Sequence, residues 1–272
     1  MTELQTFRKA HFTRKTPLTK DQLAAIRAGD ACWLHSWDTS SEINGPGTRI
    51  TLFMAGCELR CQYCHNPDSV FTEFGQFATL DEVWERVKRY KKVYEYTGGG
   101  VTASGGEPTF QWNFLRKLFT RAKEEGIHTT LDSCGYLGRL VKDEDMDLID
   151  LVMLDLKEGT PEGYKQTTTR RLQPSVDFGD RLDKAGITLW GRYVLVPGLT
   201  DSDASIEGIA DIASRWTHLD HIDILPFHQY GRDKWHELGL LYQLEDTPEP
   251  TKAEVARARS MFEERGIAVK TY

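Results

Sequence analysis

The chain has 272 residues, of which 39% are hydrophobic and 28% charged, a composition typical of a globular protein with a substantial core. Its formal net charge of −7 disfavours a nucleic-acid-binding protein, because such proteins usually carry a basic face. Since the sequence contains neither an apolar run near the ~20 residues of a membrane-spanning helix nor the apolar centre of a signal peptide, we expect a cytoplasmic protein that binds no nucleic acid and no membrane.

Residues 1–30 are predicted to form an N-terminal extension, mobile or peripheral, ahead of a single domain over residues 31–272. This extension carries six Lys or Arg against three Asp or Glu, which is typical of a solvated arm. Thr19 and Gln22 have the spacing of a capping box, and the pair predicts a short helix that ends near Gly29.

After residue 30, strand-like and helix-like segments alternate along the chain. Strands are predicted at 49–56, 100–106, 128–135, 150–157, 187–198 and 221–228. Helices are predicted at 80–97, 114–126, 175–186, 204–216 and 251–266. Such alternation predicts an α/β protein with a parallel sheet and right-handed crossovers. A closed barrel of eight such units takes about 250 residues, so the six units here predict a partial barrel or an open doubly wound sheet.

Three of the five cysteines, Cys57, Cys61 and Cys64, lie within eight residues, directly after the first predicted strand. A disulfide scaffold would distribute paired cysteines along a short secreted chain, so this clustering predicts metal binding instead. Thiolates hold iron–sulfur clusters, and a four-iron cube needs one ligand for each iron. Three protein ligands therefore leave one iron open, and an open iron can bind a substrate.

Other interpretations of these cysteines stay open. The three thiolates would bind structural zinc together with His65, although zinc sites usually contain two separated cysteine pairs. Cys61 to His65 also match the C-x-x-C-H motif of c-type haem attachment, a modification that normally requires export. A fully ligated electron-transfer cluster would take Cys134 or Cys32 as its fourth ligand.

The loop GCELRCQYCHNPDS resembles the signature of the radical S-adenosylmethionine (radical SAM) superfamily. Within that superfamily the chain is most similar to the activating enzymes of glycyl radical enzymes, above all those of pyruvate formate-lyase. The likeness continues in order through NGPGTRITLFMAGC, GGGVTASGGEP, LDSCGY, LVMLDLK, RYVLVPGLTD and ILPFHQYGRDKW, from about residue 33 to the C-terminus. It implies a partial (β/α)6 barrel of the TIM type, a single radical SAM domain, with the cofactors at the C-terminal ends of the strands.

Carried over residue by residue, the resemblance implies a [4Fe–4S] cluster on Cys57, Cys61 and Cys64, with S-adenosyl-L-methionine bound to the open iron. No catalytic residue beyond the cluster and this cofactor is expected. Glu107 is expected to accept a hydrogen bond from the cofactor's ammonium group, and Lys157 to bind its carboxylate. The residues expected at the S-adenosyl-L-methionine site are Tyr63, Cys64, His65, Gly105, Gly106, Glu107, Asp132, Asp155, Leu156, Lys157, Arg192 and His228, and those expected to bind a monovalent cation are Asp132, Ser133, Met153 and Asp155.

The resemblance also implies the reaction and its partners. A reduced cluster would cleave S-adenosyl-L-methionine to a 5′-deoxyadenosyl radical, which abstracts hydrogen from a glycine Cα of the partner enzyme. The implied partner is pyruvate formate-lyase, and the implied electron donor is a flavodoxin or a ferredoxin. The rival interpretations are an activase of another glycyl radical enzyme and a non-catalytic iron–sulfur or zinc protein.

Three local features refine this comparison. No cysteine lies between Cys64 and Gly105, where many related activases carry a ferredoxin-like insert, and this favours the pyruvate formate-lyase type. Asn44 stands where the family often has Asp, which leaves open any role of that carboxylate toward the partner's glycine loop. Cys134 stands where Asn is common, and we predict that it is not a cluster ligand.

Overall fold

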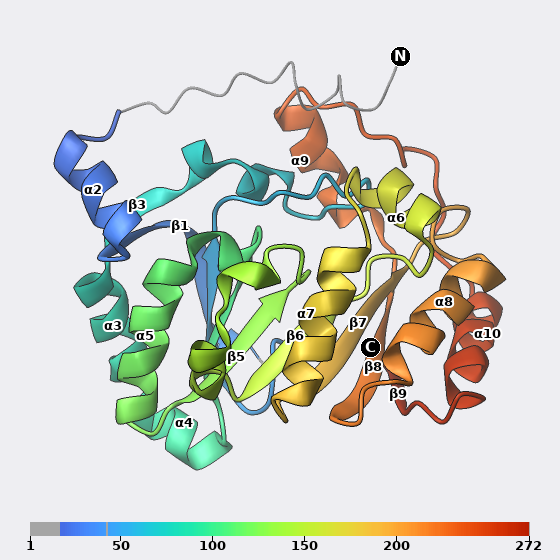
Figure 1. Ribbon diagram of the computed structural model, residues 1–272. Coiled ribbons are helices and arrows are strands. Elements are labelled where there is room, and N and C mark those ends of the chain that lie inside the picture. The colour runs from blue at the N-terminus through green and yellow to red at the C-terminus, as the bar shows by residue number, and fades with distance from the viewer. Residues whose placement is uncertain (1–16, 42, 272) are drawn as a thin grey trace.

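The computed structural model describes residues 17–41 and 43–271. Within them, one nine-stranded sheet has the order β3-β1-β2-β4-β5-β6-β7-β8-β9 and does not close on itself (Figure 1). Its six central strands pair in parallel and confirm the six predicted strands: β2 (Arg49–Met54), β4 (Gly100–Gly105), β5 (His128–Ser133), β6 (Leu151–Asp155), β7 (Thr188–Leu195) and β8 (Leu219–Pro226). The predicted α/β partial barrel is therefore confirmed.

Three further strands, which the sequence analysis does not predict, extend both edges of the sheet. β1 (Ala31–Ser41) pairs antiparallel with β2, β3 (Gln76–Thr79) pairs antiparallel with β1, and β9 (Val269–Thr271) pairs in parallel with β8. The second half of β1 alternates half-buried and exposed residues, as expected for a strand with one covered face. β9 has only three residues, too few for a periodic pattern to indicate a strand.

Most helices lie on the outer face of the parallel sheet (Figure 1). The α-helices are α2 (Lys20–Ala28), α3 (Leu80–Arg89), α4 (Lys91–Thr97), α5 (Trp112–Glu124), α6 (Pro161–Thr168), α7 (Gln173–Lys184), α8 (Asp203–Ala213), α9 (Arg232–Glu237) and α10 (Lys252–Glu263). Short 3₁₀ helices are η1 (Pro67–Val70), η2 (Thr72–Phe74), η3 (Pro108–Gln111), η4 (Gly138–Leu140), η5 (Asp143–Leu148) and η6 (Gln229–Gly231).

The helix predictions are confirmed with one exception. The predicted capping box is present, because the Thr19 hydroxyl accepts a hydrogen bond from the Gln22 N–H (3.2 Å). The single helix predicted over 80–97 is wrong, because Tyr90 leaves helical geometry (φ −96°, ψ 8°) and separates α3 from α4. The Tyr94 hydroxyl donates to the carbonyl of Val87 (3.1 Å), which satisfies a group at the end of α3. The sequence analysis does not predict α6 or α9.

The two faces of the parallel strands differ in chemistry. On the outer face, Leu52, Ala103, Leu131 and Leu154 are fully buried and join the main apolar core under the helices. On the inner face, the alternating positions are largely polar; they include Thr51, Thr102, Ser104, Thr130, Asp132, Arg192 and Asp223. A polar interior can bind a polar ligand, whereas closed barrels usually fill their interior with branched apolar side chains.

Arg49 closes the amino-terminal end of this inner face and is fully buried. Its guanidinium donates to the hydroxyls of Thr102 and Thr130 (both 2.8 Å) and to the carbonyl of Pro46 (2.8 Å). Burial lowers the pKa of Arg49 to about 10, so the side chain stays charged at neutral pH. These bonds hold the loop that contains Asn44 at the sheet edge opposite the cysteines, which follow the other end of β2.

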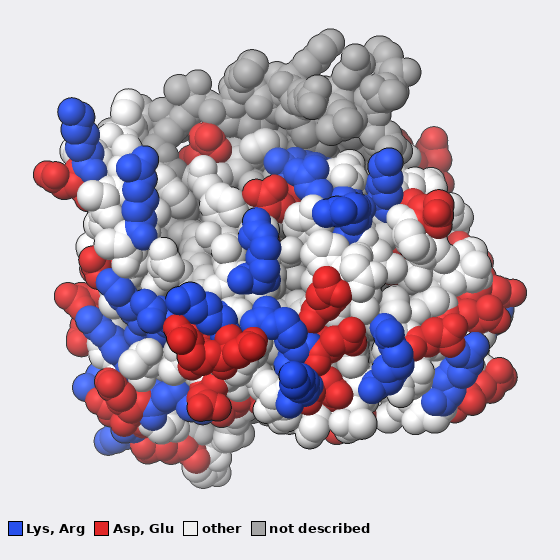
Figure 2. Space-filling model, in the orientation of Figure 1, with Lys and Arg blue, Asp and Glu red and all other residues white. Residues whose placement is uncertain are grey.

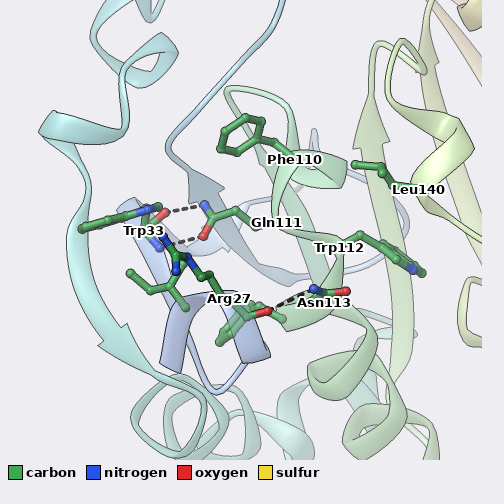
Figure 3. Close-up of a pocket in the computed structure, with 9 residues that line it drawn as sticks. Arg27, Trp33, Phe110, Gln111, Trp112, Asn113 and Leu140 are labelled. Carbon is green, nitrogen blue, oxygen red and sulfur yellow. Dashed lines mark hydrogen bonds between the residues drawn. The ribbon is translucent and has the colours of Figure 1, made fainter. Parts of the chain in front are cut away.

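The described part of the predicted extension packs against α5. The Asn113 amide donates to the carbonyl of Arg27 (3.2 Å), and the Gln111 amide bonds both the N–H and the carbonyl of Trp33 (2.7 and 2.9 Å) (Figure 3). These contacts border a pocket of about 340 Å³ between α2, β1 and the start of α5. The mobility predicted for residues 1–16 lies outside the described residues, and the domain boundary at residue 30 stays a prediction.

Charged side chains of both signs are spread over the helical face of the molecule (Figure 2). No helix within residues 17–41 and 43–271 combines the length and the hydropathy that crossing a membrane requires.

Candidate active site

The cysteine loop leaves the C-terminal end of β2 and is held by backbone hydrogen bonds from distant segments. The N–H of Cys57 donates to the carbonyl of Val70 (3.1 Å), at the end of η1. The N–H groups of Arg60 and Gln62 donate to the last two carbonyls of α6 (2.9 and 3.0 Å). On the other side, the Trp235 indole of α9 donates to the carbonyl of Cys64 (2.8 Å). The loop conformation is therefore fixed by η1, α6 and α9 together.

The three loop thiols are free and half-buried between two small apolar clusters. Cys61 and Cys64 pack against the cluster around Tyr63 and Trp235, while Cys57 and Cys61 pack against the cluster around Tyr164. Burial raises the pKa of Cys61 to about 12, and the nearby Lys157 ammonium opposes this rise. Iron binding deprotonates thiols outright, so a cluster on these residues would displace the protons that burial retains.

The other two cysteines have environments of their own. Cys32 lies on β1 within the main core, and burial raises its pKa far above the ordinary value. The thiol of Cys134 is buried and donates to a carboxylate oxygen of Glu107 (2.8 Å). In the described part of the chain, no three His, Cys, Asp or Glu side chains are grouped closely enough to hold one metal ion. Three thiols on one loop fit a cube, in which each thiolate binds a different iron.

Oppositely charged side chains meet at the C-terminal ends of β5, β6 and β7. Asp132 accepts hydrogen bonds from Ser104 (2.6 Å) and Arg192 (3.2 Å), while its other carboxylate oxygen is buried without a partner. Burial raises the pKa of Asp132, and the Arg192 guanidinium opposes the rise. The Nε of Arg192 is also buried and unpaired. Because buried polar atoms in proteins are nearly always hydrogen-bonded, these two atoms are candidates to bond a polar ligand.

Lys157 connects this charged group to the cysteine loop. Its ammonium forms an ion pair with Asp155 (2.9 Å) and lies 5.7 Å from the centre of the Tyr63 ring. The Tyr63 hydroxyl in turn approaches the carbonyl of Lys157 (3.5 Å). Leu156 is buried, and its N–H donates to the carbonyl of Arg192 (2.8 Å). The structure thus brings together predicted site residues from three segments: LVMLDLK, the cysteine loop and β7.

The rings of His65 and His228 are in contact, with centres 4.1 Å apart, and the ring of Tyr230 also contacts that of His228, with centres 4.0 Å apart. Burial, followed by the neighbouring His228, lowers the pKa of His65 to about 4, so His65 is neutral at pH 7. Its Nε2 is buried without a partner. His228 does not end the sixth parallel strand as the sequence analysis expects, because β8 ends at Pro226 and His228 precedes η6.

Gly105, Gly106 and Glu107 lie where β4 meets the cysteine loop. Gly105 has φ 111°, and a side chain at Gly106 would collide with the carbonyl of Gly56. Glu107 is fully buried and accepts hydrogen bonds from Thr109, Ser133 and Cys134. This triplet therefore joins the end of β4 to the cysteine loop and to β5, and the predicted contact between Glu107 and the cofactor stays a prediction.

The residues predicted to bind a monovalent cation are only partly brought together. Asp132 and Met153 are partners in the β5–β6 register, and Asp155 is an electrostatic neighbour of Asp132. The Ser133 hydroxyl instead donates to Glu107 (2.7 Å), on the other side of β5. The cation site stays a prediction.

The residues that hold the cysteine loop from outside are not predicted from the sequence. Trp235 and Lys234 of α9 bond Cys64 and Asn66 (both 2.8 Å), and a Cβ at Gly231 would lie 2.8 Å from the Cα of His65. The motif ILPFHQYGRDKW contains all three, so the resemblance marks the segment without indicating its contacts.

The family model of the radical SAM superfamily matches residues 51–207, which include the cysteine loop and the strands from β4 to β7. The chain belongs to the radical SAM superfamily. With this match, the three-thiol loop at the C-terminal end of a parallel strand occupies the position expected of a radical SAM protein.

Individual relatives of this radical SAM protein extend the comparison. A pyruvate formate-lyase-activating enzyme of Listeria monocytogenes is 37% identical over 238 residues, which cover 85% of this chain and 95% of the relative. Pyruvate formate-lyase 1-activating enzyme of Escherichia coli strain K12 is 36% identical, covering 87% of this chain and 97% of the relative. A radical SAM methyltransferase from Sphaerobacter thermophilus shares the fold with a TM-score of 0.61 at 16% identity, over 82% of this chain and 66% of that chain.

Proposed function

We propose that this radical SAM protein is a pyruvate formate-lyase-activating enzyme, which generates a glycyl radical on that partner. The observation that carries the proposal is the loop of three free thiols beside unpaired buried polar atoms, in a chain similar to pyruvate formate-lyase-activating enzymes over 95% or more of their length. No second function is favoured by a specific contact.

Cys57, Cys61 and Cys64 hold a [4Fe–4S] cluster and leave one iron for S-adenosyl-L-methionine. When bound, this pair would supply one-electron cleavage of S-adenosyl-L-methionine and, through it, hydrogen-atom abstraction from a glycine Cα of the partner. The two apolar clusters that flank the thiols keep water away from them.

The charged side chains beside the loop bind and orient S-adenosyl-L-methionine. Asp155 and Lys157 present a carboxylate and an ammonium side by side (2.9 Å), which complements the amino and carboxylate groups of the cofactor. The unpaired atoms of Asp132 and Arg192 add one acceptor and one donor within the barrel. His65, which is neutral at pH 7, contributes an uncharged ring with a free Nε2 and contacts the ring of His228.

A reducing compartment suits this site. All five cysteines are free, and a cluster on three of them would be preserved where thiols stay reduced. We place the protein in the cytoplasm, with a flavodoxin or a ferredoxin as its electron donor.

The test is anaerobic reconstitution with iron and sulfide, reduction by photoreduced deazaflavin, and incubation with S-adenosyl-L-methionine and pyruvate formate-lyase. We expect 5′-deoxyadenosine by chromatography and a glycine-centred doublet by electron paramagnetic resonance. Cys61→Ser should abolish both signals, while Cys32→Ser, a change in the core on β1, should abolish neither. Cleavage of S-adenosyl-L-methionine without a doublet would reject pyruvate formate-lyase as the partner, and a colourless protein would reject the cluster.

A further inference from the structure

We infer that a basic surface on α6, η4 and the segment between α6 and α7 is the docking site for an acidic protein that carries one electron. This inference rests on the proposed function, because that reaction requires one electron from outside the protein. The basic surface consists of Arg139, Lys165, Arg170 and Arg171, all on segments next to the cysteine loop.

The charge of this surface differs from that of the whole protein. The chain has a net charge of −7, yet Lys and Arg side chains group over α6 and the beginning of α7 (Figure 2). Arg139 and Arg171 are exposed, and within residues 17–41 and 43–271 neither has an acidic partner within 4.0 Å. Arg170 forms a long ion pair with the carboxylate of Glu58 (3.5 Å). Exposed arginines without partners leave their charge available to an acidic protein.

Arg139 of η4 and Arg171, in the segment that precedes α7, both line a pocket of about 520 Å³. Arg181 also lines this pocket, but its guanidinium already has partners within the protein. It donates to the carbonyls of Gly138 and Val141 (3.0 and 2.6 Å) and forms an ion pair with Asp143. Asp177 contributes one opposing charge. The pocket gives the basic surface a concave centre into which part of a partner can enter.

Two contacts connect the basic surface to the cysteine loop. Tyr136 lines the pocket and packs against the same apolar cluster as Cys57 and Cys61. The carbonyl of Thr168, between Lys165 and Arg170, accepts a hydrogen bond from the N–H of Arg60 in the cysteine loop (2.9 Å). A carrier seated here would lie against the outer side of the cysteine loop, while the barrel interior stays free for S-adenosyl-L-methionine and the glycine of the partner.

One-electron carriers such as flavodoxins are acidic proteins, so electrostatic attraction would guide them to this surface and would weaken with salt. The step adds one electron to the site and removes one from the carrier, and no bond forms or breaks. Nucleic acid is a poorer fit, because the rest of the chain is acidic and would repel phosphates.

The test measures binding rather than turnover. Reconstituted protein is titrated with an oxidised acidic flavodoxin, and in parallel with a plant-type ferredoxin, by calorimetry at low and at physiological salt. Arg139→Glu with Arg171→Glu should raise the Kd for the carrier at least tenfold at low salt, and the difference should shrink as salt screens the charges. Arg139→Gln with Arg171→Gln should give an intermediate Kd.

The matched control is Lys92→Glu with Lys184→Glu, which makes the same change in net charge on exposed residues of α4 and at the C-terminal end of α7. Its Kd should stay within about twofold of the parent protein, and thermal unfolding should show that both double variants fold. Equal binding by the two reversed variants, or no binding of either carrier to the parent protein, would overturn the inference.

Reduction by uncharged photoreduced deazaflavin separates this inference from the proposed function. The Arg139→Glu and Arg171→Glu double variant should still cleave S-adenosyl-L-methionine and activate pyruvate formate-lyase at the parent rate with this reductant. If activation fails while cleavage persists, the basic surface binds the glycyl radical enzyme and not the carrier, and the inference is wrong. If cleavage fails in the parent protein as well, the proposed function itself is wrong.

Discussion

Replacing Glu107 with alanine should destabilise the protein even when no cofactor is bound. Glu107 is fully buried, and one carboxylate oxygen accepts hydrogen bonds from the N–H and hydroxyl of Thr109 (3.0 and 2.6 Å) and from the hydroxyl of Ser133 (2.7 Å). The other oxygen accepts from the N–H and the thiol of Cys134 (2.9 and 2.8 Å). The carboxylate thus joins the segments that follow β4 and β5.

The loss of unfolding free energy in Glu107→Ala depends on how many of the donors to Glu107 can form a hydrogen bond with another acceptor. The hydroxyls and the thiol rotate, but the N–H groups of Thr109 and Cys134 are fixed by the backbone and would stay buried without a partner. A buried unsatisfied group costs about 1–3 kcal/mol, so two such groups predict a loss of roughly 2–6 kcal/mol of unfolding free energy. At about 2–4 °C per kcal/mol for a chain of this size, a loss near the middle of that range lowers Tm by about 8–16 °C.

The assay is urea unfolding of the cofactor-free protein under anaerobic conditions, followed by tryptophan fluorescence. Glu58→Ala is the matched control, because Glu58 lies in the cysteine loop but makes a single long ion pair with Arg170 (3.5 Å). That half-exposed pair should contribute under about 1 kcal/mol. A Glu107→Ala protein that unfolds like the parent and loses only S-adenosyl-L-methionine binding would refute this reasoning, and would support the cofactor contact expected from the sequence.

Three further outcomes are expected. Cys134→Ser should keep the iron–sulfur absorbance after reconstitution, because the Cys134 thiol donates a hydrogen bond to Glu107. Loss of the absorbance would show that Cys134 is a cluster ligand. Burial, and after it the charge of Arg49, lowers the pKa of His128 to about 4. As the pH falls below about 6.5, His128 therefore takes up a proton in the unfolded chain before it does so in the folded protein. The unfolding free energy that His128 contributes is lost as the pH falls from about 6.5 to about 4. His128→Gln should therefore flatten the fall in unfolding free energy between about pH 7.5 and 5.5, measured by urea titration, and an unchanged slope would contradict this. Thr169→Gly should raise the unfolding free energy by about 0.5–1 kcal/mol, because Thr169 holds a left-handed φ of 66°, and a decrease would show that the threonine side chain stabilises this turn.

The sequence predicts those elements whose pattern is local and repeated. Each of the six central strands is a short segment that ends at glycine, proline or polar residues, and the cysteine loop is recognised by its spacing alone. β9 and α9 are too short to give a periodic signal, and α6 ends in two consecutive threonines, which disfavour a helix by propensity. Tertiary contacts decide these elements, which is why they emerge only in the structure.

The same distinction applies within the site. The thiols and the charged residues at the strand ends are predicted because the ends of parallel strands meet at one edge of the sheet. The role of Glu107 is not predicted, because its donors Ser133 and Cys134 lie 26 and 27 residues further along the chain. Nothing in a GGE triplet indicates whether the carboxylate faces a cofactor or closes a contact between two strands, and only the hydrogen bonds distinguish the two.

The end of α6 explains how the cysteine loop keeps its shape. The last carbonyls of a helix lack partners within it, and the N–H groups of a loop lack partners within the loop. Here the carbonyls of Thr167 and Thr168 accept hydrogen bonds from the N–H groups of Gln62 and Arg60. The end of the helix and the loop therefore each provide the hydrogen-bond partners that the other lacks. The chain must then turn sharply at Thr169, where a β-branched residue adopts the left-handed conformation at a cost of about 1–2 kcal/mol. Such strain persists only where surrounding bonds fix it, so the shape of the thiol loop depends on a helix about a hundred residues away in the chain.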